Sequence, residues 1–368
     1  MPRGRLILSS AFFFAGNADF FEKNAFPAGI FKAEVLMFFG KRWKIRLAAA
    51  CFLPALFFAG AADCFAHSGG KSVSVMCWNM ETFFDAVFDG NEYKEFSSSR
   101  SGWCESKYRV RLERAASVIK KIGCDVVVLE EMEKSGQLRD ISNQLSATFS
   151  RKSVYRHGFF AAEEGASIGC GILSRYPILS ARVHSIKVGG RKGRFQPSLR
   201  PILQVTLDVG GKKIDVFVNH WKSKSGNSAE SEQWRDRQER QLAFLMGKSV
   251  SSGVPALACG DFNRSIEEFE KRDGDGSGPN VVLKGGLSVY SPWYGDDGKI
   301  CAVGSYWYKG AWEYIDNFFS AGGISISDFA PCTAGEWADA SFRPRRYRMH
   351  PGSGYSDHLP IACKVLIL

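Results

Sequence analysis

Residues 254–263 read VPALACGDFN, and this stretch holds the most specific motif of the chain. Its first half is a short apolar run, as expected of one buried strand. Gly260 permits a close approach of two backbones, and Asp261 and Asn263, two positions apart, place their side chains on one face of an extended segment. Asp261 and Asn263 would suit a site for metal or proton chemistry, but an Asx turn at a strand end explains these residue types equally well. The other strand endings of the chain must therefore distinguish the two interpretations.

Five further apolar runs end in a carboxylate, a carboxamide or an imidazole. They read VSVMCWN at 73–79, DVVVLEE at 125–131, IDVFVNH at 214–220, WEYIDN at 312–317 and YSDH at 355–358. A strand core needs no polar ending, because a buried polar group without a partner costs about 1–3 kcal/mol. Six such endings, all with side chains suited to metal or proton chemistry, indicate strand ends that converge on one site.

Composition and charge are those of a basic globular protein. The 368 residues are 45% hydrophobic and 23% charged, which is ordinary for a folded chain. The formal net charge is +10, and a basic excess favours a polyanionic partner such as nucleic acid or acidic lipid headgroups. A plain basic surface explains this charge equally well. No linker divides residues 67–368, so we expect one α+β domain and a monomer.

The first 66 residues predict a targeting segment. A basic stretch, KRWKIR at 41–46, precedes an apolar run of small residues, and this run is shorter than the roughly 20 residues that a membrane-spanning helix needs. We expect residues 37–66 to be a cleaved signal peptide and residues 1–36 to be upstream sequence translated from a misplaced start. The protein would then be exported to the periplasm or the medium, or, as the alternative, be held at the cell surface by a lipid.

Two of the ten cysteines, Cys51 and Cys64, lie in the predicted targeting segment, and the other eight fall into two kinds. Those in apolar runs are expected in the core: Cys77, Cys124, Cys170, Cys259 and Cys363. Cys104, Cys301 and Cys332 stand in polar, loop-like surroundings, and export would permit them to form disulfides. No spacing resembles a zinc cluster.

Periodicity predicts the elements between these endings. Amphipathic helices are expected at 107–122, 137–146 and 231–247. Residues 200–207 and 213–218, joined across Gly210 and Gly211, predict a β-hairpin. The runs at 168–178 and 181–188 look like neighbouring strands.

In their order and spacing, the six endings resemble the motifs of the endonuclease/exonuclease/phosphatase superfamily, the DNase I-like proteins. The resemblance extends over residues 73–365, and its motifs are individually short but strong in combination. It implies a four-layer α/β/β/α sandwich, in which two mixed β-sheets pack face to face with helices outside. It also implies a metal-dependent hydrolase of phosphoric ester bonds, of the kind found among exported bacterial members.

The resemblance implies a metal held by Asn79, Glu131 and Asp357. Oxygen ligands suit Mg²⁺ or Mn²⁺ far better than Zn²⁺, and Ca²⁺ is a further expectation, as a structural ion. Glu130 departs from the family pattern, where a Gln stands. An extra carboxylate beside the metal would alter its affinity or raise a neighbouring pKa.

Five residues are implied to carry catalysis: His220, Asp261, Asn263, Asp316 and His358. Asp316 would orient His358 through a hydrogen bond. Asp261 and Asn263 would hold the attacking water, and His220 would contact the phosphate or protonate the leaving oxygen. The water would lose its proton to Asp261 or to His358, and the sequence leaves both open. Arg200 and Lys222 are the expected substrate contacts, although a structural ion pair explains Arg200 equally well.

Three functions are compatible with this site. The first is an exported nuclease that cleaves DNA or RNA, favoured by the basic excess, by Lys222 and Lys224, and by the basic segment RPRRYR at 343–348. The second is a sphingomyelinase-like enzyme that acts on a phospholipid headgroup or an inositol phosphate, with the aromatic residues between 293 and 312 at the membrane interface. The third, an inactive binding module, is disfavoured because every catalytic group is present. Endonuclease or exonuclease mode and one or two metals stay open.

Overall fold

The structure is a computed structural model that describes the backbone of residues 6–13 and residues 70–98, 100–147, 154–186, 199–224, 226, 228–272 and 280–368. The signal peptide predicted at 37–66 lies outside these residues. No helix in the described part of the chain is both long enough and apolar enough to cross a membrane.

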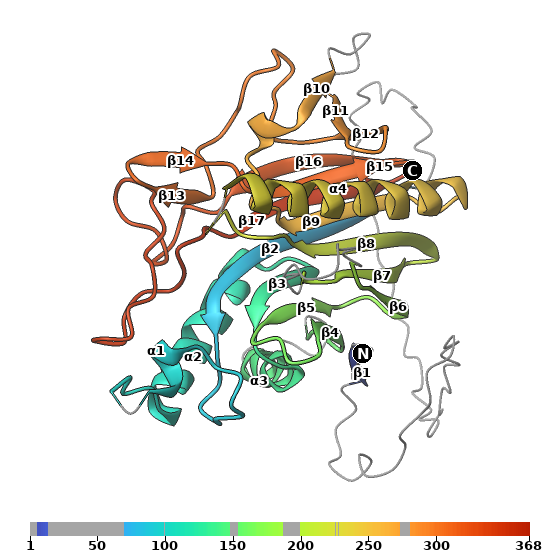
Figure 1. The fold of residues 1–368 in the computed structure, drawn as a ribbon. Coiled ribbons are helices and arrows are strands. Elements are labelled where there is room, and N and C mark those ends of the chain that lie inside the picture. Colours follow the sequence, from blue (N-terminus) through green and yellow to red (C-terminus); the bar gives the residue numbers. More distant parts are fainter. Residues whose placement is uncertain are drawn as a thin grey trace, which may run out of the picture.

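Two large mixed sheets form the centre of the molecule (Figure 1). The first sheet has the order β1-β4-β5-β3-β2-β17-β16. Its strands are β1 (Leu6–Phe13), β2 (Lys71–Phe83), β3 (Val126–Met132), β4 (His157–Glu163), β5 (Gly169–Ser174), β16 (Ile324–Pro331) and β17 (Ile361–Ile367). The second sheet has the order β10-β11-β12-β15-β9-β8-β7-β6. Its strands are β6 (Ile178–His184), β7 (Ile202–Val209), β8 (Lys212–His220), β9 (Ala256–Asp261), β10 (Glu270–Arg272), β11 (Asn280–Leu283), β12 (Leu287–Tyr290) and β15 (Asp316–Ala321). A separate hairpin joins β13 (Tyr306–Tyr308) to β14 (Ala311–Glu313).

Helices cover the outer faces of both sheets, as the predicted four-layer sandwich requires (Figure 1). The elements are α1 (Lys94–Ser97), α2 (Glu105–Ile122), α3 (Ser135–Ser146), the short 3-10 helix η1 (Ile266–Glu268) and α4 (Ser228–Ser251). The helices α2 and α3 pack on the first sheet, and α4 packs on the second. The three predicted helices are confirmed, and each begins earlier than its periodicity indicated.

Strand alternation builds two cores. Val126 and Val128 of β3 face the second sheet, whereas Val127 and Leu129 face α2 and α3. Because successive side chains of a strand point to opposite faces, a continuous apolar run fills both layers at once. The first sheet therefore carries no solvent-exposed face at its centre.

The topology brings several strand ends to one edge. β2 and β3 run parallel in the first sheet, and β8 and β9 run parallel in the second. Parallel strands end at the same edge of a sheet. β15 is antiparallel to β9 and begins at that edge, where Asp316 lies opposite Asp261.

One pairing expected from the sequence is wrong. The runs at 168–178 and 181–188 contribute to β5 (Gly169–Ser174) and β6 (Ile178–His184), and these two strands lie in different sheets, because β5 pairs with β3 and β4 whereas β6 pairs with β7. The chain passes from one sheet to the other around Pro177, and local apolar patterns carry no information about such a crossing. The predicted hairpin is confirmed: β7 and β8 meet across Gly210 and Gly211, whose φ angles are 62° and 91°.

The cysteines of the apolar runs are buried, as predicted, and all eight described cysteines are free thiols. Cys104, Cys301 and Cys332 thus form no disulfide within the described residues.

Candidate active site

The polar endings of the six runs meet at one edge of the sandwich. His220 lies opposite Asp261 in the parallel pair of β8 and β9, and Asp316 lies opposite Asp261 on its other side. From the first sheet, Asn79 Nδ2 donates a hydrogen bond of 3.0 Å to Asp261 Oδ2. Side chains from both sheets therefore form one site, centred on Asp261.

His358 and Asp316 form a buried pair within it. His358 Nδ1 lies 2.8 Å from Asp316 Oδ2, and the Ser305 hydroxyl donates to the same oxygen at 2.6 Å. The Tyr306 ring lies along one face of the imidazole, with ring centroids 4.6 Å apart. Since Nδ1 is engaged by the carboxylate, Nε2 faces the site, 4.0 Å from Asp261 Oδ2. This is the geometry that fixes the tautomer of a catalytic histidine.

The surrounding charges control the protonation of His358. Burial alone would lower its pKa, but the carboxylates of Asp316, Asp261 and Asp357 outweigh burial and raise the pKa well above its usual value. The imidazolium form is therefore favoured at neutral pH.

Asp261 is 2% exposed and is held by three hydrogen bonds. Its Oδ1 accepts from the backbone N of Asn263 at 2.7 Å, and its Oδ2 accepts from the side chains of Asn79 and Asn263 at 3.0 and 3.1 Å. Burial raises the pKa of Asp261 to about 7, against the lowering effect of His358. Such a value suits a general base near neutral pH.

The backbone around Asp261 explains why this motif has its residue types. Asn263 has a φ of 47°, a left-handed conformation that Asn adopts more readily than most residues. Gly260 has a φ of 141°, and a Cβ there would lie 1.9 Å from the carbonyl oxygen of Asn219. Only glycine fits this close approach of β8 and β9.

Asn79, Glu131 and Asp357, the expected metal ligands, are placed at the same edge. Glu131 Oε1 accepts from Asn79 Nδ2 at 3.3 Å, and its Oε2 accepts from the backbone N of Thr82 at 2.7 Å. Glu131 has a φ of 59°, so the end of β3 turns this side chain out of the strand alternation. Asp357 is partly exposed, with Oδ1 3.9 Å from His358 Nε2.

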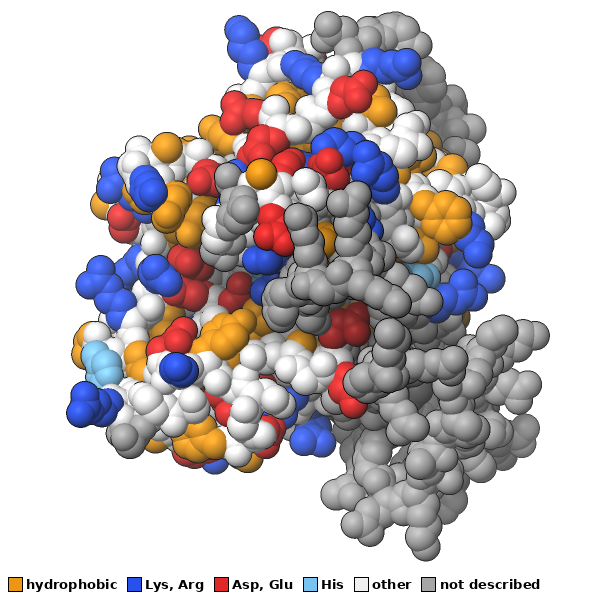
Figure 2. Space-filling model, viewed as in Figure 1, with side chains coloured by type: hydrophobic (Ala, Val, Ile, Leu, Met, Phe, Trp, Pro, Cys, Tyr) orange, Lys and Arg blue, Asp and Glu red, His pale blue; other side chains and the backbone are white. Residues whose placement is uncertain are grey.

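The donor set at this edge fits a divalent cation. Four carboxylates gather here: Glu81, Glu131, Asp261 and Asp357. Burial first, and then the charge of Asp357, raise the pKa of Glu81 to about 7 in spite of its ion pair with Arg346. In the view of Figure 2, acidic side chains gather beside basic ones on the left half of the molecule. Excess negative charge presented on oxygen atoms is what Mg²⁺ binds.

Among the described residues, Asp261, Asp316 and His358 form a group of possible ligand atoms that lie within 4.8 Å of one another. Because His358 and Asp316 are hydrogen-bonded to each other, this group is better suited to proton transfer. The oxygens of Asn79, Glu131 and Asp357 remain the set that suits a hard ion.

His220 lies at the buried end of β8. Its Nε2 is 3.6 Å from Glu131 Oε1 and 3.7 Å from Asp261 Oδ2, and its Nδ1 has no partner among the described residues. Burial, with the charges of Arg200 and His358, lowers its pKa well below the usual value. A neutral imidazole can hold a phosphate oxygen but is a poor proton source, which favours the first of its two expected roles.

Arg200 and Lys222 lie beside this site and pair with no carboxylate of the described residues. Arg200 Nη1 donates to the carbonyl oxygen of Trp221 at 3.2 Å, so it is not the structural ion-pair partner considered from the sequence. Lys222 is fixed through its backbone N, which donates to Gln238 Oε1 at 2.8 Å. Lys224 instead pairs with Glu268 at 2.6 Å, which leaves it unsuited to the phosphate contact expected for it.

Glu130 was expected beside the metal ligands, and this expectation is wrong. It is 0% exposed and accepts a hydrogen bond of 3.0 Å from the Cys77 thiol. Strand alternation places it on the face of β3 that carries Val126 and Val128, between the sheets. Burial raises the pKa of Glu130 well above its usual value, which favours its neutral form in the core.

Several residues of the site carry no strand-end signal and were missed. Glu81 Oε1 lies 2.5 Å from Arg346 Nε, and its Oε2 accepts from the backbone N of Tyr347 at 3.0 Å. This ties the basic segment at 343–348 to the end of β2. Ser305 and Tyr306, which support Asp316 and His358, precede β14 in a loop and hairpin with no distinctive motif.

The aromatic stretch between 293 and 312 is mostly packing. Trp293 and Tyr294 are buried, and Tyr306 lies against His358. Tyr308 is exposed over 46% of its surface. This stretch therefore offers little apolar surface to a membrane.

Comparison with known proteins gives a family and a fold. The sequence model described as the Endonuclease/Exonuclease/phosphatase family matches residues 76–358. TDP2 from Caenorhabditis elegans is 18% identical over 81% of this chain and 75% of that chain, with a TM-score of 0.51. An endonuclease/exonuclease/phosphatase from Beutenbergia cavernae is 19% identical over 81% and 72%, with a TM-score of 0.50. The human Nocturnin catalytic domain, solved with a bound sulfate anion, is 15% identical over 80% and 93%, with a TM-score of 0.50. No curated protein sequence matches the chain. At these identities the solved structures show the fold alone.

Proposed function

Because the chain belongs to the endonuclease/exonuclease/phosphatase family, whose members are metal-dependent hydrolases of phosphoric esters, we propose that it is an exported nuclease that cleaves DNA or RNA with Mg²⁺ or Mn²⁺. The observation that carries this proposal is the buried His358–Asp316 pair, whose free Nε2 lies 4.0 Å from Asp261 Oδ2. Arg200 and Lys222, which pair with no carboxylate of the described residues, lie beside the same site.

Each residue of the site has its own role in the proposed hydrolysis. Asp261 and Asn263 orient the attacking water, and Asp261 takes its proton. His358, held by Asp316 and favoured as the imidazolium, donates from Nε2 to a phosphoryl oxygen. Asn79, Glu131 and Asp357 would hold the divalent ion, whose chemistry is to polarise the phosphoryl group and stabilise the charge of the leaving oxygen.

The side chains around the site support a nucleic-acid strand as substrate. Arg200 and Lys222 have no carboxylate partner among the described residues and can neutralise phosphates. Neutralisation of phosphates supplies most of the affinity of proteins for nucleic acids. On the other side, the Arg343 guanidinium lies 4.4 Å from the centre of the Trp307 ring, and Tyr308 next to it is exposed. Arginine and aromatic groups side by side suit a phosphate backbone with bases that stack.

A phospholipid headgroup is the second candidate substrate. Phe342 and Tyr308, both neighbours of the Arg343–Trp307 pair, are 54% and 46% exposed. Two such side chains are few for a membrane-inserting surface, which is why the nucleic acid ranks first.

The substrate is tested with the purified full chain and Mg²⁺. Plasmid DNA, RNA and sphingomyelin vesicles are offered side by side, and we expect cleavage of DNA or RNA. Activity confined to the vesicles would overturn the choice of substrate. N-terminal sequencing of the protein made by its own cell tests export, with an N-terminus near residue 67 expected; residues from 1–36 would contradict the predicted signal peptide.

A further inference from the structure

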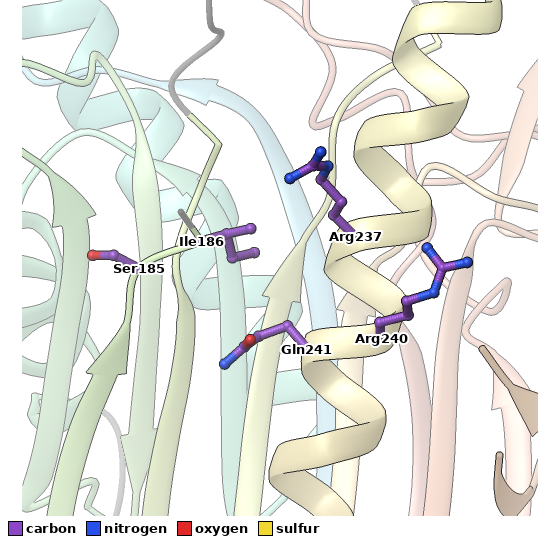
Figure 3. Close-up of a pocket in the computed structure, with 5 residues that line it drawn as sticks. All are labelled: Ser185, Ile186, Arg237, Arg240 and Gln241. Carbon is purple, nitrogen blue, oxygen red and sulfur yellow. The ribbon is translucent and has the colours of Figure 1, made fainter. Parts of the chain in front are cut away.

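A cavity of about 440 Å³ lies beside α4, away from His358 and Asp316. The described residues that line it are Ser185 and Ile186, which follow β6, and Arg237, Arg240 and Gln241 of α4. Figure 3 shows Arg237 and Gln241 extending from α4 toward the chain at Ile186, whereas the guanidinium of Arg240 leans to the other side of the helix. A ligand in this cavity would meet two cations that are spread apart.

The two arginines are exposed and have no carboxylate partner among the described residues. Three of the four carboxylates of α4, Glu232, Asp236 and Glu239, are engaged on another side of the helix, where each pairs with Arg264. Arg264 thus neutralises three acids of α4, whereas Arg237 extends toward the chain at Ile186 and Arg240 leans to the other side of the helix. Such unneutralised cations at a cavity favour an anion.

Aromatic residues lie near both arginines in α4. The Arg237 guanidinium lies 5.5 Å from the centre of the Trp234 ring, one turn earlier in α4. Phe244, one turn after Arg240, is exposed over 65% of its surface. Aromatic rings next to arginines are typical of surfaces on which the bases of a single strand stack.

This surface lies at the active-site edge of the second sheet. β6 ends at His184, which pairs with Ile202 at the start of β7, two residues after Arg200. On the α4 side, Gln238 follows Arg237 and accepts the hydrogen bond from the backbone N of Lys222. A polyanionic chain that leaves the scissile site past Arg200 and Lys222 would therefore reach Arg237 next.

We propose that Arg237 and Arg240, with Gln241 and the chain at Ser185, form a second phosphate-binding site. It holds phosphate groups of a single nucleic-acid strand several nucleotides from the bond that is cleaved. Because the two guanidinium groups diverge, they contact successive phosphates rather than one. This inference rests on the proposed function, since its ligand is the substrate of that reaction.

The test compares wild type with the double variant Arg237→Ala/Arg240→Ala on a dinucleotide and on a single strand of about 30 nucleotides. We expect KM for the long strand to rise about tenfold and kcat to hold, because each arginine contributes one exposed phosphate contact. Cleavage of the dinucleotide should not change. In metal-free buffer, fluorescence anisotropy should show weaker binding of the long strand and a salt slope smaller by about 1.4, or about 0.7 for each lost contact.

The matched control is Arg109→Ala, which removes an exposed arginine of α2 that pairs with Glu105. This variant should cleave both substrates as wild type does. If wild type cleaves both substrates and the double variant equals it on the long strand, the second site is overturned and the proposed function stands. Equal losses on both substrates, or an equal loss in Arg109→Ala, overturn it as well. If wild type cleaves neither substrate, the proposed function falls and this site falls with it.

Discussion

Asp316→Asn tests whether the carboxylate acts through His358. Asp316 is 1% exposed and accepts two hydrogen bonds on Oδ2, from His358 at 2.8 Å and from Ser305 at 2.6 Å. The Asn side chain keeps the volume but loses the charge, and its amide group favours the wrong tautomer of the imidazole. A charge-assisted hydrogen bond contributes about 1.5–3 kcal/mol, and loss of the orienting acid in such pairs lowers kcat by up to about 10⁴-fold.

We therefore expect kcat to fall about 10²- to 10⁴-fold, with KM nearly unchanged because the buried carboxylate does not meet the substrate. Initial rates on plasmid DNA at saturating Mg²⁺ measure both. Ser305→Ala is the matched control: it removes one bond to the same oxygen and leaves the charge, so kcat should fall about tenfold or less.

A double-mutant cycle supplies the refuting result. In a His358→Ala background, Asp316→Asn should cost nothing further, because the group that it orients is already gone. An equal loss in both backgrounds would show that Asp316 acts independently of His358. Thermal unfolding of each variant excludes a trivial loss of fold.

Three further predictions follow from single contacts. Glu131→Gln should weaken Mg²⁺ binding at least about tenfold in calorimetric titration, and unchanged binding would remove Glu131 from the ligand set. Burial raises the pKa of Glu130, so the wild type must bind a proton on folding and its free energy of unfolding falls as pH rises above about 4.5. Glu130→Gln removes this dependence; its stability relative to wild type should increase between pH 5 and pH 8 in urea unfolding, and a constant difference would contradict a neutral buried acid. Gly260→Ala should destabilise the fold by more than about 3 kcal/mol, because its Cβ would meet the carbonyl oxygen of Asn219. The control Gly247→Ala, in α4 with nothing near its Cβ, should instead stabilise by about 0.5–1 kcal/mol.

The resemblance to the family supplied the four layers, whereas the convergence of the polar strand endings on one edge could be predicted from local features of the sequence. Short apolar runs, their polar endings and the glycine at position 260 each have a direct physical cause. Asp261, Asp316 and His358 come together as soon as these strands share one edge.

Other features depend on pairings that no local pattern encodes. Glu81 and Arg346 are 265 positions apart, and neither stands at the end of an apolar run. Glu130 was expected beside the metal, but it follows the alternation of β3 and lies between the sheets. Glu131, the expected ligand, reaches the site edge because its positive φ breaks that alternation. The separation of β5 from β6 likewise reflects the choice of partners by a whole sheet rather than by either strand.

Hydrolysis of plasmid DNA by wild type, Glu131→Gln and His358→Ala, each with Mg²⁺ and with EDTA, tests the proposed chemistry most directly. We expect cleavage by wild type with Mg²⁺, none with EDTA, and losses of at least about 100-fold in both variants. Equal rates in all three proteins, with and without the metal, would contradict a metal-dependent phosphodiesterase at this site.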